Sequence, residues 1–301
     1  MLLNKLFCTK RTTVGEQVFK AFAYIFLVLL AICFILPILT IIASSFVSAE
    51  EYIERGAFII IPHKFDFTAY EMLLSKSDMV ITAYSITIFK VVVGTILSVI
   101  LTAITAYALS KDTLPLMSTI SLLMFFTMIF NGGLIPSYLV VTGLGLKNSI
   151  WSLILPGIIS TWYVFIMRNF FKQIPNSIEE AAKIDGAGTI RTMVEIIFPL
   201  SLPAFATISL FYAVAQWNSW FDAALYIDDA AKMPVQNLLR NIVVSSTSAV
   251  DITAFGDIET LPPARSMRSA MIVIGTLPII VIYPFLQKYF IGGMTVGAVK
   301  G

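Results

Sequence analysis

The side chains best suited to hold a polar solute lie close together near the end of a long apolar segment. Gln216 and Asn218 carry amides and stand on either side of the indole of Trp217. Amides form hydrogen bonds with hydroxyl groups, and flat aromatic faces suit the C–H surfaces of a sugar ring. The same residue types also form aromatic belts at membrane–water interfaces. We expect a solute path along this segment, with Asn131 and Tyr163 as further candidates for its wall.

Few residues of this chain are of the types that perform catalysis or bind metal ions. The one histidine is His63, and the two cysteines, Cys8 and Cys33, are far apart in sequence. A metal or thiol site needs several such ligands together, so we expect neither a metal site nor a disulfide, and His63 is predicted to be a solvated loop residue. The sequence also contains no G-x-x-x-x-G-K-[ST] phosphate loop. A membrane enzyme and a chain that hydrolyses ATP or binds a cofactor by itself are therefore disfavoured.

Lys90 is the one charged residue well inside an apolar segment. A lysine is costly in hydrocarbon, so its ammonium group should reach the interface, a cavity or a neighbouring helix. An ion-coupled secondary transporter would pair ionisable residues within its spans, and no acidic partner for Lys90 is found in the core of any span. We expect a structural role for Lys90 and keep the secondary transporter as a less favoured alternative.

The elements that must position these residues are membrane-spanning helices. The chain has 301 residues, of which 58% are apolar and only 13% are charged, and its mean hydropathy is +0.88. A soluble protein of this length needs far more charge to cover its surface. The composition predicts an all-α polytopic membrane protein in one bundle, with spans near residues 21–46, 80–109, 115–142, 149–170, 196–221 and 268–287. The third of these should be broken at residues 131–133, where Asn-Gly-Gly occurs.

The charges between the spans predict the orientation of the chain. With the N-terminus inside, the inner segments carry a net charge of +5 and the outer segments a net charge of −4. Because basic residues concentrate on the cytoplasmic side, both termini should be cytoplasmic. We expect an N-terminal tail at residues 1–20, a membrane domain at residues 21–290 and a C-terminal tail at residues 291–301. The first outer segment, about residues 47–79, should form a small folded loop.

The longest polar interruption in the middle of the chain is the loop at residues 175–203. Ser177 and Glu180 have the spacing of a capping box at the start of a helix. Gly186 can end that helix with a positive φ angle, and Thr189 can begin a second short helix. The loop is therefore predicted to be a helix, a glycine turn and a helix at the membrane surface. One side of the second helix should carry Ile190, Met193, Val194 and Ile197.

The spacing within this loop resembles the motif E-A-A-x3-G-x9-I-x-L-P of ABC importer permeases. The matching residues are Glu180-Ala181-Ala182, Gly186, Ile196 and Phe198-Pro199, and Phe198 alone departs from the motif while remaining apolar. The resemblance implies that the loop is a coupling helix that docks in a groove of an ATP-binding subunit. The contact residues that it implies are Glu179, Glu180, Ala181, Ala182, Asp185, Gly186 and Pro199, with Lys300 and Gly301 in the tail.

The chain as a whole is similar to the maltose-type (MalG-like) branch of carbohydrate ABC importer permeases. This resemblance is carried by Trp217-Asn218 and by residues 234–238 and 297–301, while residues 131–136 look more like the complex-oligosaccharide permeases. It implies six transmembrane helices of the type I importer (MetI-like) fold in a bacterial cell membrane.

The same resemblance implies the partners and the solute. They are a second homologous permease, two ATP-binding subunits that hold ATP and magnesium, an extracytoplasmic solute-binding protein, and membrane lipid, with no nucleic acid. The solute is expected to be a sugar, most simply an oligosaccharide. An importer for amino acids or phosphate stays open as an alternative, because the loop motif does not exclude it.

Overall fold

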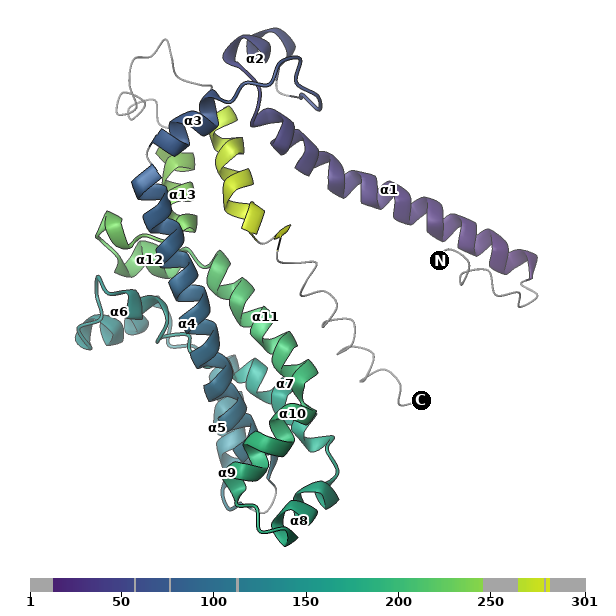
Figure 1. Ribbon diagram of the computed structural model, residues 1–301, viewed down its shortest axis with the longest axis vertical. Helices are drawn as coiled ribbons and strands as arrows, with labels where there is room; N and C mark the ends of the chain where they lie inside the picture. Colours follow the sequence, from purple (N-terminus) through teal and green to yellow (C-terminus); the bar gives the residue numbers. More distant parts are fainter. Residues whose placement is uncertain are drawn as a thin grey trace. The chain divides into compact units, whose positions relative to one another are not determined.

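The computed structural model describes residues 13–56, 58–75, 77–111, 114–245, 265–278 and 280–281 (Figure 1). These residues form helices, turns and loops with no strand among them, and this confirms the predicted all-α class. Most of the predicted tails lies outside the described residues, including Cys8, Lys300 and Gly301. The chain divides into two compact units, Met1–Met72 with Ile252–Val273 and Leu73–Asp251 with Ile274–Gly301.

The first unit begins with a long apolar helix, α1 (Val14–Ser44). It is long and apolar enough to cross a membrane, which agrees with the first predicted span, although the helix starts seven residues earlier than residue 21. Most of its apolar side chains are exposed, and Cys33 is a free, exposed thiol. Such a surface suits surroundings of lipid tails, which are as apolar as the side chains themselves.

A small folded loop follows α1 and is organised around the buried carboxylate of Glu51. The helix α2 (Ala49–Arg55) is capped by Ser48, whose hydroxyl accepts a hydrogen bond from the backbone N–H of Glu51. The Glu51 carboxylate accepts from the backbone N–H of His63 at 2.9 Å and from the Arg55 guanidinium at 2.5 Å. Burial by itself raises the pKa of Glu51, but these hydrogen bonds outweigh it and hold the pKa below its ordinary value. The His63 side chain is exposed, as predicted.

The loop around Glu51 should loosen at acidic pH. Because the folded-state pKa of Glu51 is depressed, its contribution is present above the ordinary carboxyl pKa and is lost as the pH falls through the folded value. In hydrogen exchange corrected for intrinsic rates, Glu51→Gln should reduce protection of residues 49–63 at pH 7, by roughly 1–2 kcal/mol of opening free energy. The exposed neighbour provides the control, Glu50→Gln, which should behave as wild type. Equal protection in Glu51→Gln and wild type would contradict this role.

The second unit is organised around α4 (Ser77–Ser110), which is also long and apolar enough to cross a membrane. Two helices, α7 (Thr161–Lys172) and α11 (Leu202–Asn218), pack along it (Figure 1). The face of α4 within the bundle carries small residues four positions apart, all of them buried: Gly94, Ser98, Thr102 and Ala106. Small side chains let two helices approach closely, which is what holds helices together in lipid.

A side chain of α11 lies against the backbone of α4 at Gly94. A Cβ atom at this position would lie 3.1 Å from the side-chain nitrogen of Gln216 on α11. Further along the same row, the hydroxyl groups of Thr102 and Tyr212 form a buried hydrogen bond of 2.7 Å between the two helices. Glycine at position 94 therefore leaves the space that the α11 side chain occupies.

We expect Gly94→Leu to separate α4 from α11 and to lower the stability of the folded protein by roughly 1–3 kcal/mol. Thermal unfolding of the purified protein in detergent measures this effect. The matched control is Gly143→Leu, because nothing lies within 4 Å of a Cβ atom placed at Gly143. If the two variants unfold at the same temperature, close packing at Gly94 does not stabilise the second unit.

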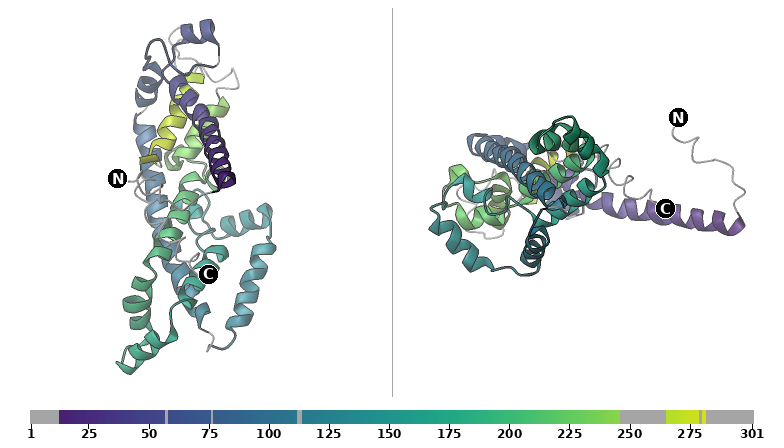
Figure 2. Two further views of the ribbon diagram at one scale, coloured as in Figure 1. Left: turned by 90° about the vertical axis from the view of Figure 1, so that its right-hand side faces the viewer. Right: turned by 90° about the horizontal axis from the view of Figure 1, so that it is seen from below.

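The third predicted span is broken where the sequence indicated. Its two halves are α5 (Met117–Ile129) and α6 (Leu134–Gly143), whose axes differ by 114° (Figures 1 and 2). Gly133 has a φ angle of 87°, a conformation that glycine adopts readily. The side-chain oxygen of Asn131 accepts a hydrogen bond from the backbone N–H of Gly133 at 2.8 Å, so the Asn-Gly-Gly sequence forms the break itself.

The prediction of a continuous helix at residues 149–170 is wrong. The structure has a short 3-10 helix, η2 (Ile150–Leu153), then a non-helical segment up to Ser160, and only then α7. Pro156 and Gly157 lie within this non-helical segment, and both disfavour the interior of a helix because proline lacks an N–H donor and glycine loses much backbone entropy. The fourth predicted span is therefore α-helical only in its second half.

The fifth predicted span also differs from a straight helix. The helical stretch Thr189–Leu200 meets α11 at an angle of 82°, so the straight part begins at Leu202 rather than at residue 196. Ser201 has non-helical backbone angles, and Pro203 lies in the first turn of α11, where a missing N–H costs nothing. The sixth predicted span begins in the helix at residues 265–278, and its end lies outside the described residues.

Candidate coupling surface and solute path

The loop at residues 175–203 folds as a helix, a glycine turn and a second helical stretch, as predicted. The first helix is α8 (Asn176–Ile184), and Gly186 then reverses the chain with a φ angle of 80°. The second stretch starts at Thr189, as expected, and consists of α9 (Thr189–Arg191), the π-helical segment η3 (Thr192–Ile197) and α10 (Phe198–Leu200).

The predicted capping box at the start of α8 is wrong. The helix begins at Asn176, and its N-cap is Pro175, with no side-chain capping bond. Pro175 leads directly into the helix, so Ser177 already lies in the first turn, where its hydroxyl is no longer in the N-cap position. The sequence pattern located the helix correctly but placed its N-cap two residues too late, at Ser177 instead of Pro175.

An ion pair anchors α8 to the end of α4. The Lys111 ammonium, just beyond α4, pairs with the half-buried carboxylate of Glu179 and also lies 4.4 Å from the centre of the Tyr107 ring. On the same end of α4, the Arg168 side chain of α7 donates a hydrogen bond of 2.8 Å to the carbonyl oxygen of Leu109. Glu179, predicted from the resemblance as a contact residue, thus binds a partner within its own chain. The pairing joins residues 68 positions apart, and the sequence offered no signal for it.

The alanine pair of α8 is divided between the inside and the outside of the chain. Ala182 is 5% exposed and packs within its own chain, whereas Ala181 is exposed. Glu180 and Asp185 are exposed as well. Of the other residues predicted in this loop, Gly186 and Pro199 are also exposed. Any partner that docks on α8 therefore meets Ala181 and not Ala182.

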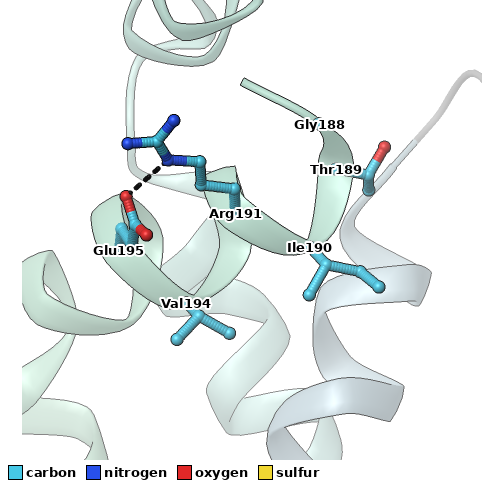
Figure 3. A pocket seen from close by; sticks show the side chains of 6 residues that line it. All are labelled: Gly188, Thr189, Ile190, Arg191, Val194 and Glu195. Carbon is cyan, nitrogen blue, oxygen red and sulfur yellow. Dashed lines mark hydrogen bonds and ion pairs between the residues drawn. The ribbon is translucent and has the colours of Figure 1, made fainter. Parts of the chain in front are cut away.

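Exposed apolar side chains extend this surface beyond the predicted residues. Ile184 at the end of α8 is 86% exposed, and Ile190 and Val194 lie in the second stretch, over a shallow groove of about 790 Å³. Figure 3 shows Ile190 and Val194 projecting together, while Arg191 and Glu195 form an ion pair of 2.8 Å on the neighbouring side. Ile184 was not among the predicted contact residues, although an isoleucine directly before an Asp-Gly turn was a usable signal.

The prediction that the second helical stretch carries its four apolar residues on one side is wrong. Ile190 and Val194 are exposed, whereas Ile197 is completely buried and Met193 is half-buried. The π-helical turns of η3 contain more residues per turn than an α-helix, so the spacing used for the prediction does not apply there.

The residues predicted for the solute path fall into a buried group and an exposed group. Trp217 is buried, donates a hydrogen bond from its indole N–H to the carbonyl oxygen of Gly275 at 3.3 Å, and packs beside Tyr84. Gln216 is buried against Gly94, whereas Asn218 at the end of α11 is exposed. The structure therefore gives Trp217 a packing role within the chain and leaves Asn218 as the accessible amide.

The two weaker candidates for the wall of the path lie elsewhere. Tyr163 is half-buried. Its ring stacks on that of Phe211, with 5.7 Å between ring centres, and lies edge-on to that of Tyr212, with 4.8 Å between ring centres. Tyr212 precedes Gln216 by about one turn of α11. Asn131 is exposed at the break between α5 and α6, where its side chain is occupied by its own turn. Tyr163 is thus associated with α11, whereas Asn131 belongs to the separate break between α5 and α6.

Lys90 faces a neighbouring helix, one of the placements expected from the sequence. Its side chain is buried, and its ammonium donates hydrogen bonds to the carbonyl and the hydroxyl of Ser219 at 3.1 and 2.6 Å. Ser219 is the C-cap of α11, so the charge lies at the negative end of that helix. The ammonium also interacts electrostatically with Asp222 in α12 (Phe221–Tyr226). Lys90 therefore holds the end of α11 against α4.

Comparison with known proteins identifies the fold and the class of molecule. Residues 112–296 match the family described as "Binding-protein-dependent transport system inner membrane component". The chain is also 43% identical, over 95% of its length and 99% of the relative's, to the polygalacturonan/rhamnogalacturonan transport system permease protein YtcP of Bacillus subtilis. The chain belongs to this family of transport permeases. It is a membrane component of a transport system, which confirms the class that the loop motif implied.

Further comparisons agree with both branches named from the sequence. The permease is 42% identical to Protein LplC of Bacillus subtilis, over 97% of its own length and 98% of the length of LplC. It is 28% identical over 95% of its length to the trehalose/maltose transport system permease protein MalG of Thermococcus litoralis, and covers 99% of it. A solved bacterial ABC transporter "involved in the import of the acidic polysaccharide alginate" contains a chain with TM-score 0.86 and 32% identity, covering 94% of this permease and 100% of that chain. The importer-permease fold is thereby confirmed.

The ion pair between Lys111 and Glu179 should hold α8 in place in this permease. Lys111→Glu is expected to repel Glu179 and to lower hydrogen-exchange protection of α8 by about 1 kcal/mol of opening free energy, and adding Glu179→Lys should restore it. The exposed pair Arg191 and Glu195 provides the control, since the same exchange of charges there should change protection little. Unchanged protection in Lys111→Glu would contradict the anchoring role.

Proposed function

We propose that this permease is one of two membrane subunits of a bacterial ABC importer for oligosaccharides. The observation that carries the proposal is the 43% identity over nearly the whole length of a permease named for polygalacturonan/rhamnogalacturonan transport. The structural similarity to a chain of an alginate importer supports it. The second subunit would be a homologous permease, and an extracytoplasmic solute-binding protein would deliver the sugar.

The proposed coupling to ATP hydrolysis runs through α8. ATP and magnesium belong to two partner ATP-binding subunits, and the permease itself binds no cofactor and hydrolyses no ATP. The exposed side chains of Glu180, Ala181, Ile184 and Asp185 offer the contact surface. A displacement of α8 would reach α4 through the pair of Lys111 with Glu179, because α8 is tied to α4 there. The tail residues Lys300 and Gly301 are proposed to reach between the same two subunits.

The proposed path and orientation follow from the same surface. With α8 in the cytosol, both termini are cytoplasmic, and the permease crosses the cell membrane several times. The end of α11 then lies toward the outer side, where the solute-binding protein would deliver the sugar. Asn218 is the accessible path residue, while Gln216, Trp217, Tyr163 and Asn131 would shape the path from behind or from its edge.

Uptake measurements in cells test this function. Cells that lack the permease should lose uptake of trigalacturonate, of maltotriose or of both, and the wild-type chain should restore it. With Ala181→Trp, the restored uptake should be at least about tenfold lower than with the wild-type chain. A bulky side chain on the exposed face of α8 would weaken the contact with the ATP-binding subunits by roughly 1–3 kcal/mol. Accumulation of this variant in the membrane should remain normal, and the ATP-binding subunits should co-purify poorly.

Two outcomes would contradict the proposal. Loss of amino acid or phosphate uptake, with normal uptake of both oligosaccharides, would favour the alternative solute classes. Full uptake and co-purification in Ala181→Trp would remove α8 from the contact with the ATP-binding subunits. Lys64→Gln, a change at an exposed residue of the loop after α1, is the control and should transport as wild type.

A further inference from the structure

Two cationic side chains contact consecutive residues at the end of α11. Lys90 donates its hydrogen bonds to Ser219, as described above, and the guanidinium of Arg240 lies over the ring of Trp220, 3.3 Å from its centre. Arg240 belongs to α13 (Val235–Ser245), which packs beside α12 and α4. The end of α11 is therefore flanked by two positive charges from different helices.

The two cations are in different chemical situations. Lys90 is 1% exposed, its hydrogen bonds go to Ser219, and its charge interacts with Asp222. Arg240 is exposed, and within the described ranges no carboxylate lies within ion-pairing distance of its guanidinium. The charge of Asp222 is thus associated with Lys90, and the charge of Arg240 remains available to a ligand.

The stacking on Trp220 holds the Arg240 guanidinium in a defined plane. Trp220 is itself half-buried and contacts Phe221 edge-on, at 5.5 Å and 90°. A guanidinium stacked by its face on an aromatic ring keeps its N–H groups at the edge, where they can bind a carboxylate through two parallel hydrogen bonds. Because the plane is already fixed, less side-chain entropy is lost when the ligand binds.

The helix that carries Arg240 is anchored at its start. The backbone N–H of Val235 donates a hydrogen bond of 2.9 Å to the hydroxyl of Thr87 on α4. Val235 and Leu238 are buried in one cluster with Trp217. The side chain of Arg240 therefore projects from a packed element, and its position relative to α11 is determined by that packing.

We propose that Arg240 binds the carboxylate of an acidic sugar unit of the transported oligosaccharide, a uronate, and that Trp220 positions the guanidinium for this contact. This proposal rests on the proposed function as an oligosaccharide permease. The exposed amide of Asn218, two residues before Trp220, is suitably placed along the chain to bind a hydroxyl group of the same solute. The site would select acidic over neutral sugars where they approach the end of α11.

The test compares two probes of equal length that differ in charge. The purified full-length permease in lipid nanodiscs is titrated with trigalacturonate and with its fully methyl-esterified form, and binding is measured by calorimetry. Wild type should bind the acid at least about tenfold more tightly than the ester, as expected for a charge-assisted hydrogen-bond pair. The preference should weaken as salt is raised, because the contact is exposed.

Variants assign the preference to named side chains. Arg240→Gln should abolish the preference for the acid, and Arg240→Lys should retain part of it, since an ammonium keeps the charge but not the planar pair of donors. Trp220→Leu should reduce the preference while the cation remains, and Trp220→Tyr should recover it in part. Lys64→Gln removes an exposed charge elsewhere and should leave the preference unchanged.

Three results would overturn the proposal. They are equal binding of acid and ester by wild type, absence of binding for both probes, and an unchanged preference in Arg240→Gln. If Arg240→Gln instead weakens capture of the solute-binding protein with the preference intact, Arg240 contacts a protein carboxylate and the uronate site is wrong. Uptake in cells separates the two proposals. If deletion of the permease abolishes oligosaccharide uptake but Arg240→Gln keeps the preference for the acid, only the uronate site is wrong. If oligosaccharide uptake stays normal after deletion of the permease, the proposed function is wrong.

Discussion

Close packing of α4 against α11 determines the arrangement of the second unit. In lipid, apolar side chains gain little by leaving their surroundings for each other, so helices associate through close backbone approach and interhelical hydrogen bonds. The α4 row of Gly94, Ser98, Thr102 and Ala106 supplies both, since its side chains are small and the Thr102 hydroxyl bonds to α11. Tyr212 extends this contact, because its hydroxyl bonds to Thr102 and accepts a hydrogen bond from the backbone N–H of Ser160, at the start of α7. Three helices therefore meet at one hydroxyl group.

Two interruptions of the apolar segments fall beside residues with polar side chains. Asn131 lies at the break between α5 and α6, and Asn218 and Trp220 lie where α11 ends. A broken helix leaves backbone donors and acceptors without partners, and at membrane depth these must be covered by protein or reached by water. Ser160 shows one solution, since the Tyr212 side chain supplies its partner. At the break between α5 and α6, the Asn131 side chain supplies a partner in the same way, since it accepts from the backbone N–H of Gly133.

Sequence reasoning succeeded where a local signal was sufficient. Hydropathy located α1 and α4, and Asn131-Gly132-Gly133 and Gly186 marked two turns correctly because glycine was needed for positive φ angles at Gly133 and Gly186. Predictions failed where the structure depends on contacts between segments that are far apart in the sequence. The burial of Ala182 and the partner of Glu179 depend on packing between distant parts of the chain.

Two other differences from the sequence predictions have local causes that were underestimated. Pro156 and Gly157 interrupt a segment whose hydropathy suggested one helix, and Pro175 starts α8 ahead of the expected cap at Ser177. Hydropathy measures only whether a segment can enter lipid, and contains no information about the path of the backbone. The contact of Arg240 with Trp220 had no local signal, because the two residues are twenty positions apart in the sequence.

Because η3 is π-helical, the number of residues in the loop at residues 175–203 affects which side chains are exposed as much as the residue types do. A π turn holds one residue more than an α turn, so side chains after it are rotated by roughly 100° relative to an uninterrupted α-helix. This rotation lets one short stretch serve two environments, with Ile190 facing outward and Ile197 inside the bundle. A relative that lacked a single residue here could keep every helix and still present a different side of the stretch to its partner. The register of this segment therefore determines which of its side chains are exposed.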